Sequence, residues 1–549
     1  MISEYDVRPM SGLAELAELI VAHLRKAGTQ TLFGVPGGGG NLDLIEAARQ
    51  AGLPFVLTST ETGAAIAAIA QAEILQRPGA CLTTLGPGAA SVVNGVACAS
   101  LERAPLMVFT DSHPIGAAWE FAHQRFDHVA LLGRITKWSA LLMPGDAPET
   151  IARAFRELVT LPPGPVHLDC PADVSTSSSG TRPSALDRGG LGAFVARRAD
   201  PDEAGHFDTL VSRARKPLVL VGLGARRPAD AMAIRHLCER WSVPAMVTYK
   251  AKGVIPDSHA CFAGVFTNGS IERAVIAQSD LLIGIGLDPV ELLPRPWTIS
   301  QPIVGLSGWR MPDDHVPFAA QHVGDLSHTV QLLEATMGPA AWDLDEIARI
   351  VQGDQRLADI PTDGLAAQRV VDVAASILAG RCRVTVDAGA HMLPALMRWP
   401  VAAPNDLLIS NGLSTMGFAL PAAIGAALAD RGRPVVALTG DGGLLMCLGE
   451  LLTAVREKLP IIVIVFSDAS LSLIEIKQQA RKLPAGGVAI GEMDWPALAD
   501  SFGAAGFRAS SEQELAVAIE HAAGYDGPSL IEAKIDRSNY GRMLKVLRG

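Results

Sequence analysis

Cysteine is scarce in this 549-residue chain, which contains seven cysteines and no C-x-x-C pair. An odd count without paired spacing argues against a disulfide framework and against a zinc ribbon. We therefore interpret the cysteines as small core residues. Long hydrophobic runs are also missing. The longest, 416–429, has 14 residues with glycine and proline inside it, which is too short to span a bilayer.

Basic residues are not in excess. The chain has 46 Lys and Arg against 57 Asp and Glu, a formal net charge of −11, so neither nucleic acid nor an anionic membrane is an expected partner. Only 19% of residues are charged while 49% are hydrophobic, which excludes disorder as the main state. The first ten residues lack the basic and apolar regions of a signal peptide, and a cytoplasmic location is expected.

Segments with strand-like and helix-like patterns alternate along the whole sequence. The length exceeds what one hydrophobic core supports, about 250–300 residues, and repeated strand–helix units predict parallel sheets covered by helices on both faces. The fold class is therefore α/β, with three doubly wound parallel-sheet domains at 8–175, 195–337 and 364–545. The Ser-rich stretch 175–184 is the clearest linker. Polar sequence around 336–363 is expected to form the next connection.

The sharpest local signal is Thr439-Gly-Asp-Gly-Gly443, which separates an apolar strand from a helix expected over 444–458. Open α/β sheets bind ligands at the carboxyl ends of their strands, and free backbone N–H groups in such a turn favour phosphate. Asp441 would repel phosphate unless a cation lay between them. The next strand ends at Asp468, a second carboxylate of the kind that Mg²⁺ prefers. A G-D-G turn alone is nevertheless common in loops.

The spacing between the G-D-G turn and the second carboxylate indicates a particular kind of site. Twenty-four residues lie between Gly442 and Ser467, and this arrangement resembles the binding motif of thiamine diphosphate-dependent enzymes, in which an Asn pair follows G-D-G. The resemblance covers nearly the whole chain and is closest to the acetolactate synthase-like branch of the decarboxylase/carboligase superfamily. It implies that the three domains are pyrimidine-binding, central and diphosphate-binding. The other matching segments are 34–38, 60–65, 86–88, 102–105, 164–174, 414–425 and 449–454.

The resemblance implies a role for individual residues. Mg²⁺ would be bound by Asp441, Asp468 and the backbone carbonyl of Ser470. Met416 would wedge between the two rings of the cofactor, and Ser414 would accept a hydrogen bond through its backbone. The remaining cofactor contacts would come from Gly389, Ala390, His391, Gly440, Gly442, Gly443 and, closing the pocket, Ile474.

Glu61 begins an expected helix among small and apolar neighbours. Poor solvation there would hold its proton more tightly than water does. In the family such a glutamate faces the pyrimidine ring of a cofactor held by the partner subunit, which implies a homodimer or homotetramer with active sites at the subunit interface. Taken alone, Glu61 is more simply a charge at a helix N-terminus.

Several positions depart from the family pattern. Asp468 stands where an Asn is expected, and Ser112, Asp288 and Lys477 replace the Gln, basic residue and Trp of the synthases. Branched-chain acetolactate synthesis therefore stays open. The turn at Gly222-Leu-Gly resembles a dinucleotide-binding turn without its third glycine, so FAD in the central domain is undecided.

Histidines cluster after the strand at 105–110. His113 follows its end and is a candidate for proton transfer, because imidazole titrates near neutral pH. A lone histidine is more often structural, and His123 and His128 receive no role.

The resemblance thus implies an enzyme that uses thiamine diphosphate and Mg²⁺ to cleave or form a carbon–carbon bond next to a carbonyl. Decarboxylation of a small-molecule 2-oxo acid followed by carboligation with an aldehyde or ketone is the first interpretation. A simple decarboxylase and a benzaldehyde lyase-like enzyme that cleaves 2-hydroxyketones are the alternatives. A non-catalytic paralogue is disfavoured, because Glu61, Met416, Asp441 and Asp468 occur together.

Overall fold

A computed structural model describes residues 11–115, 122–171, 173–174, 201–312, 314–357, 359 and 361–548. The chain divides into two compact units, Met1–Ala193 and Phe194–Gly549, which are treated separately below. The expected linker at 175–184 and the expected boundaries at 8, 175 and 195 lie outside the described residues. Within the described ranges, no helix combines the length and the apolar character needed to cross a membrane.

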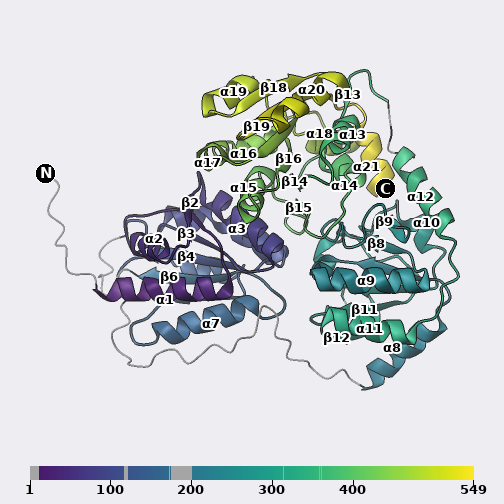
Figure 1. Cartoon of the computed structure of the whole chain (residues 1–549), viewed down its shortest axis with the longest axis horizontal. Coiled ribbons are helices and arrows are strands. Elements are labelled where there is room, and N and C mark those ends of the chain that lie inside the picture. Colours follow the sequence, from purple (N-terminus) through teal and green to yellow (C-terminus); the bar gives the residue numbers. More distant parts are fainter. Residues whose placement is uncertain are drawn as a thin grey trace. The chain divides into compact units, whose positions relative to one another are not determined.

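The first unit contains one six-stranded sheet in the order β2-β1-β3-β4-β6-β5, with every pair parallel. Buried side chains of α1, α2 and α7 pack on one face, and α3 and α5 lie on the other. Figure 1 shows helices α1 and α7 on one side of this sheet and α3 on the other. The strands are β1 (Leu32–Val35), β2 (Phe55–Leu57), β3 (Gly79–Thr83), β4 (Leu106–Ser112), β5 (Trp138–Leu141) and β6 (Val166–Pro171). The helices are α1 (Ser11–Ala27), α2 (Asn41–Gln50), α3 (Glu61–Leu75), α4 (Pro87–Ser91), α5 (Val93–Leu101), α6 (His128–Leu132) and α7 (Ala147–Val159).

The second unit begins with a six-stranded parallel sheet in the order β12-β11-β10-β7-β8-β9. Helices α8, α9 and α11 pack on one face, and α10 and α12 on the other. The strands are β7 (Pro217–Val221), β8 (Ala245–Val247), β9 (Phe262–Val265), β10 (Leu281–Ile285), β11 (Ile303–Ser307) and β12 (Phe318–Val323). The helices are α8 (Pro201–Arg213), α9 (Pro228–Trp241), α10 (Arg273–Ile276), α11 (Leu326–Thr336) and α12 (Leu344–Leu357).

A seven-stranded parallel sheet completes the second unit. Its order is β13-β19-β17-β16-β14-β15, and β18 also pairs with β19. The strands are β13 (Leu365–Ala366), β14 (Arg383–Val386), β15 (Leu407–Ile409), β16 (Val435–Gly440), β17 (Ile461–Ser467), β18 (Ala505–Ala509) and β19 (Ser529–Asp536). The helices are α13 (Ala367–Leu378), α14 (Met392–Arg398), α15 (Ala419–Ala429), α16 (Asp441–Cys447), α17 (Glu450–Arg456), α18 (Ser472–Ala480), α19 (Trp495–Phe502), α20 (Glu512–Ala523) and α21 (Tyr540–Arg548).

The three parallel sheets confirm the predicted fold class. Two local expectations were wrong. The stretch 336–363 was expected to be a connection but contains α12. Its Ile347 is 1% exposed and packs on the sheet formed by β7 to β12. The helix expected over 444–458 starts earlier, at Asp441, and breaks into α16 and α17 around Gly449. The exact domain boundaries stay a prediction.

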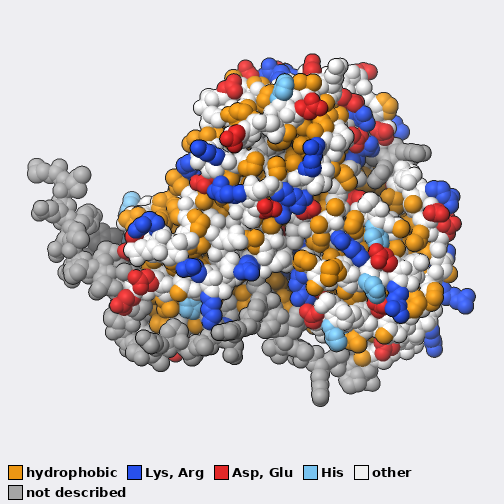
Figure 2. Space-filling model, viewed as in Figure 1, with side chains coloured by type: hydrophobic (Ala, Val, Ile, Leu, Met, Phe, Trp, Pro, Cys, Tyr) orange, Lys and Arg blue, Asp and Glu red, His pale blue; other side chains and the backbone are white. Residues whose placement is uncertain are grey.

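Acidic and basic side chains are interspersed on the face shown in Figure 2. A mixed surface of this kind agrees with the modest net charge and offers no large field of one sign on that face.

Candidate active site

Asp441 and Asp468 meet where two neighbouring strands end. β16 and β17 are parallel and adjacent, so the residues after them lie at the same edge of the sheet. One oxygen of Asp441, Oδ2, accepts hydrogen bonds from the backbone N–H groups of Asp468 (3.1 Å) and Ala469 (2.7 Å). Its Oδ1 accepts from the N–H of Gly442 at 2.7 Å. The Asp441 carboxylate therefore ties the glycine turn to the loop after β17.

The electrostatics of this pair fit a divalent cation. Burial raises the pKa of Asp441. Burial, with repulsion from Asp441 as a further cause, raises the pKa of Asp468 to about 6. Two poorly solvated carboxylates disfavour one another's charge, and a cation with oxygen ligands removes that cost. The described residues hold no group of three or more His, Cys, Asp or Glu arranged for a metal. A cation here would draw further ligands from backbone or phosphate oxygens.

Ser470, the third expected ligand, lies in the same loop. It is buried, and its hydroxyl donates to Glu475 Oε2 at 2.7 Å. Its own N–H donates to Asp468 Oδ1 at 3.1 Å. The loop is therefore folded around the Asp468 side chain.

His391 supplies an unsatisfied polar atom beside the glycine turn. The ring is 4% exposed, stacks on Phe466 with centroids 5.2 Å apart, and its Nε2 has no hydrogen-bond partner among the described residues. A Cβ on Gly389 would lie 2.6 Å from the ring, and one on Gly440 would lie 3.2 Å from it. Burial lowers the pKa of His391 to about 3. A phosphate group at this position would provide the missing partner and oppose that shift.

Met416 approaches the same turn from another segment. A Cβ on Gly442 would lie 3.6 Å from Met416 Cε, and it would also meet Leu471 Cδ2 at 2.8 Å and Ile490 Cδ1 at 3.0 Å. Apolar side chains thus converge where the sequence places the cofactor. Ser414 is exposed and has a left-handed backbone conformation, with φ of 55°. Ile474, on α18, is 44% exposed. The roles of these residues remain predictions.

Asp387 is the organising residue that the sequence analysis missed. It follows β14 with 0% exposure, and burial raises its pKa to about 6. Its carboxylate accepts four hydrogen bonds, from Ala388 N (2.9 Å), Phe418 N (3.2 Å), Gly417 N (3.1 Å) and Thr439 Oγ1 (2.9 Å). A Cβ on Gly443 would lie only 2.6 Å from its Oδ2. One carboxylate therefore joins the loop 388–391, the Met416 segment and the G-D-G turn. An acidic residue directly after an apolar strand was the available signal.

In the first unit, Glu61 is the first residue of α3. Thr60 caps this helix by accepting a hydrogen bond from Gly63 N at 2.9 Å. A Cβ on Gly88 would lie 3.2 Å from Glu61 Oε1, so the carboxylate packs against that glycine. His113 lies after β4, where its Nε2 is 2.9 Å from the carbonyl oxygen of His123. The catalytic roles of Glu61 and His113 stay predictions.

A run of four glycines, 37–40, wraps around Asp111 in the same unit. Asp111 Oδ1 accepts from the N–H of Asn41 at 2.9 Å, and its Oδ2 would lie 3.0 Å from a Cβ on Gly37 and 3.1 Å from one on Gly39. Burial raises the pKa of Asp111 to about 6. The glycine run is therefore a packed loop held by one carboxylate.

Comparison with known proteins agrees with this geometry. Family models for thiamine pyrophosphate enzymes match the N-terminal TPP-binding domain at 14–131, the central domain at 208–304 and the C-terminal TPP-binding domain at 387–533. A catabolic acetolactate synthase of Raoultella terrigena is 30% identical over 542 residues, covering 95% of each chain. The chain belongs to the thiamine diphosphate-dependent enzymes.

Other members of this family are similar over the same length. Acetolactate synthase of Bacillus subtilis is 29% identical over 542 residues, covering 95% of this chain and 93% of its own. A probable 2-ketoarginine decarboxylase of Pseudomonas aeruginosa is 29% identical over 536 residues, covering 94% and 93%. The resemblance found in the sequence is confirmed: this is an enzyme of the thiamine diphosphate-dependent carboligase and decarboxylase family, acetolactate synthase-like in its relatives.

Proposed function

We propose that this enzyme uses thiamine diphosphate and Mg²⁺ to decarboxylate a small 2-oxo acid and to transfer the resulting acyl unit to a second carbonyl compound. The observation that carries the proposal is the carboxylate pair of buried Asp441 and half-buried Asp468, on adjacent strand ends beside the unsatisfied imidazole of His391. The activities for which these relatives are named, acetolactate synthesis and 2-ketoarginine decarboxylation, both suggest a 2-oxo acid as substrate. Simple decarboxylation is thus the second candidate. The benzaldehyde lyase-like alternative remains a third outcome of the test below.

The residues of the second unit would bind and orient the cofactor. Asp441, Asp468 and the carbonyl of Ser470 would hold Mg²⁺, and the Gly440–Gly443 turn with His391 would receive the diphosphate. When bound, thiamine diphosphate supplies the electron sink for cleaving a bond next to a carbonyl. Met416 would fix the angle between its two rings from beside Gly442. Such fixed contacts act through positioning and electrostatics.

Glu61 would exchange a proton with the pyrimidine ring of the cofactor. Its place at the start of α3, against Gly88, gives the carboxylate a defined position. Following the resemblance, the ring belongs to a cofactor held by a second copy of the chain, in a homodimer or homotetramer. Exposed apolar side chains beside the cofactor turn support a partner there: Leu445 and Met446 on α16 and Leu452 on α17 are 38%, 59% and 48% exposed.

The central domain does not fit FAD. In a dinucleotide-binding turn the backbone N–H groups face a diphosphate. Here the N–H of Leu223, between Gly222 and Gly224, already donates to Glu291 Oε2 at 2.7 Å. Burial raises the pKa of Glu291 to about 8, and nearby Asp288, 2% exposed, adds to that shift. The Glu291 carboxyl group therefore already takes the Leu223 N–H that a diphosphate would need at this turn.

One experiment tests the activity. The purified enzyme, loaded with thiamine diphosphate and Mg²⁺, is incubated singly and pairwise with 2-oxo acids, aldehydes and 2-hydroxyketones, and the products are identified by mass. Carbon dioxide together with a new hydroxyketone or hydroxyacid supports the proposal. Carbon dioxide with free aldehyde alone would assign a simple decarboxylase, and cleavage of hydroxyketones alone would assign a lyase. Glu61→Gln is the matched control, because it retains the size and polarity of the side chain.

A further inference from the structure

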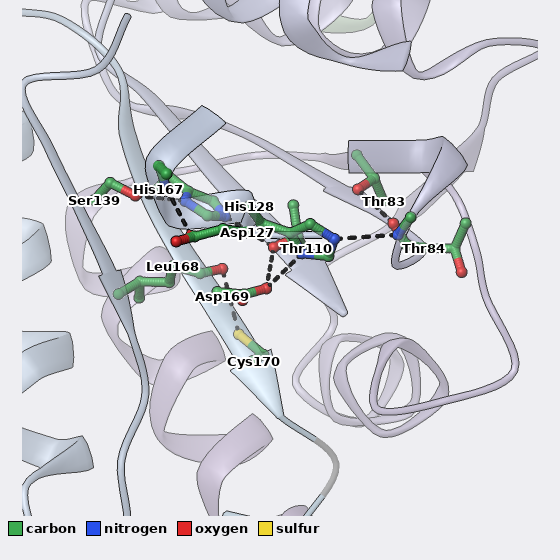
Figure 3. A network of polar contacts seen from close by, with 12 residues as sticks. Thr83, Thr84, Thr110, Asp127, His128, Ser139, His167, Leu168, Asp169 and Cys170 are labelled. Atoms are coloured by element: carbon green, nitrogen blue, oxygen red, sulfur yellow. Dashed lines mark hydrogen bonds and ion pairs between the residues drawn. The ribbon is translucent and has the colours of Figure 1, made fainter. Parts of the chain in front are cut away.

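A line of buried polar side chains crosses the sheet of the first unit (Figure 3). It starts on β5, passes through β6 and β4, and reaches α6. All but Ser139 are nearly inaccessible to solvent. Its contacts are Ser139 Oγ to His167 Nδ1 (2.7 Å), His167 Nε2 to Thr110 Oγ1 (2.8 Å), Thr110 Oγ1 to Asp169 Oδ1 (2.6 Å) and Asp169 Oδ1 to His128 Nδ1 (3.0 Å).

The line ends at the backbone N–H of Gly86, and this group fixes the direction of the hydrogen bonds along the line. The N–H of Gly86 lies 3.2 Å from His128 Nε2. An amide N–H can only donate, so His128 Nε2 accepts and the proton of the neutral ring sits on Nδ1, facing Asp169. Thr110 donates to the same carboxylate, and His167 then donates to Thr110. Burial lowers the pKa of His167 to about 4, which agrees with a neutral ring. Every member of the line therefore has a partner.

Gly86 connects this line to the proposed catalytic carboxylate. It is the residue before α4, with φ of 64° and ψ of −106°, and a Cβ there would lie 2.7 Å from Gln124 Cβ. Two residues later, Gly88 packs against Glu61 Oε1. A shift of the Gly86–Gly88 turn would therefore move the surface on which the Glu61 carboxylate rests.

We propose that His128 is a positioning residue for Glu61, which it serves by anchoring the Gly86–Gly88 turn through Nε2 while Asp169 holds the ring through Nδ1. The inference rests on the proposed role of Glu61. A fully satisfied buried network is rigid and holds one geometry. A proton-transfer group must be held within a few tenths of an ångström of its partner to act. The network supplies that rigidity to the Gly86–Gly88 turn through the hydrogen bond at Gly86.

Two substitutions of His128 test the contacts of the two ring nitrogens separately. Asn at position 128 retains an N–H near the place of Nδ1 but has nothing at Nε2, so it keeps Asp169 and releases Gly86. Gln places its carbonyl oxygen near Nε2, so it keeps Gly86 and leaves Asp169 with one donor fewer. Ser139→Ala, at the far end of the line, is the control for damage to the network alone.

Three quantities are measured on each loaded enzyme: the melting temperature, the affinity for thiamine diphosphate by calorimetry, and the rate at which the cofactor's C2 hydrogen exchanges for deuterium. His128→Asn should exchange about 10-fold more slowly than the parent with unchanged affinity, since one anchoring hydrogen bond is lost. His128→Gln should melt lower but exchange within about 3-fold of the parent. Ser139→Ala should exchange at the parental rate.

Exchange in His128→Asn at the parental rate would overturn the inference, as would equal slowing in the Asn and Gln variants. Should His128→Asn not fold, Gly86→Ala displaces the same turn and should slow exchange, and parental exchange in that variant is equally decisive. Glu61→Gln keeps the two hypotheses apart. Parental exchange in Glu61→Gln removes the proposed role of Glu61 itself, whereas slow exchange there with fast exchange in His128→Asn removes only the role of His128.

Discussion

Asp468→Asn should have opposite effects on the metal-free and the metal-loaded enzyme. Burial and repulsion from Asp441 raise the pKa of Asp468 from 3.8 to about 6. The folded state thus binds its proton more tightly, and the resulting stability is fully present below about pH 4 and is lost as the pH rises through about 6. At about 1.36 kcal/mol for each unit the loss would be about 3 kcal/mol. Partial exposure of the side chain reduces it to about 2 kcal/mol.

Asn carries no charge and therefore avoids this loss. It can still accept from Ser470 N, and the Ser472 hydroxyl, which now donates to Asp468, can reverse to accept. The metal-free Asn variant should melt about 4–8 °C above the parent at pH 7.5 and at the parental temperature near pH 4. With Mg²⁺ and cofactor present it should bind the metal more weakly, because a carboxylate ligand has become neutral.

The assay is a series of thermal melts from pH 4 to pH 8 in chelator, repeated with Mg²⁺ and thiamine diphosphate. Asp526→Asn, at an exposed position, serves as the control for removing one negative charge from the same unit. A parental melting temperature at pH 7.5 in chelator would refute the electrostatic argument. Unchanged Mg²⁺ affinity would refute the assignment of Asp468 as a ligand.

Glu61→Gln should fold and bind the cofactor yet lower kcat by about 10²–10⁴-fold, the usual contribution of a positioned proton-transfer group; a near-parental kcat would contradict its role. Asp441→Ala should bind thiamine diphosphate far more weakly, with partial recovery at high Mg²⁺, and unchanged affinity by calorimetry would remove the metal assignment. Asp387→Asn should weaken cofactor binding about 10-fold or more, since an amide N–H would face the donors that the carboxylate now accepts from. Purified protein should show no stoichiometric flavin absorbance, because Glu291 occupies the central glycine turn.

The sheets could be predicted because each buried parallel strand is a short apolar run between turn residues. β17 is buried over six consecutive residues, and the succession of such runs along the chain indicates the fold class. Helix α12 could not be found in this way. Its apolar residues are few and recur among charged ones in LDEIARIVQGDQRL, so polarity dominated a pattern that is amphipathic rather than disordered.

The candidate site was predictable only where its residues form a short motif with a recognisable spacing. The G-D-G turn and Asp468 are recognisable by spacing, and the structure brings them together at one sheet edge. Asp387 and His128 were not, since their importance comes from contacts 30–52 and 41–42 residues away along the chain. A hydrogen bond between distant segments leaves no periodic signal in either segment.

The four glycines around Asp111 look interchangeable in the sequence, yet the folded chain treats them as three different kinds of position. At Gly37 a Cβ would lie 2.3 Å from Thr84 Oγ1, which bars a side chain there. At Gly39 and Gly40 a Cβ would lie 3.1 and 3.4 Å from an Asp111 oxygen, close contacts that a small shift of the carboxylate can accommodate. Gly38 is exposed, and a Cβ there would meet nothing within 4 Å. Side-chain diversity among natural variants of this loop should therefore concentrate at position 38, which gives the enzyme one site for changing the chemistry of the loop while its anchor stays in place.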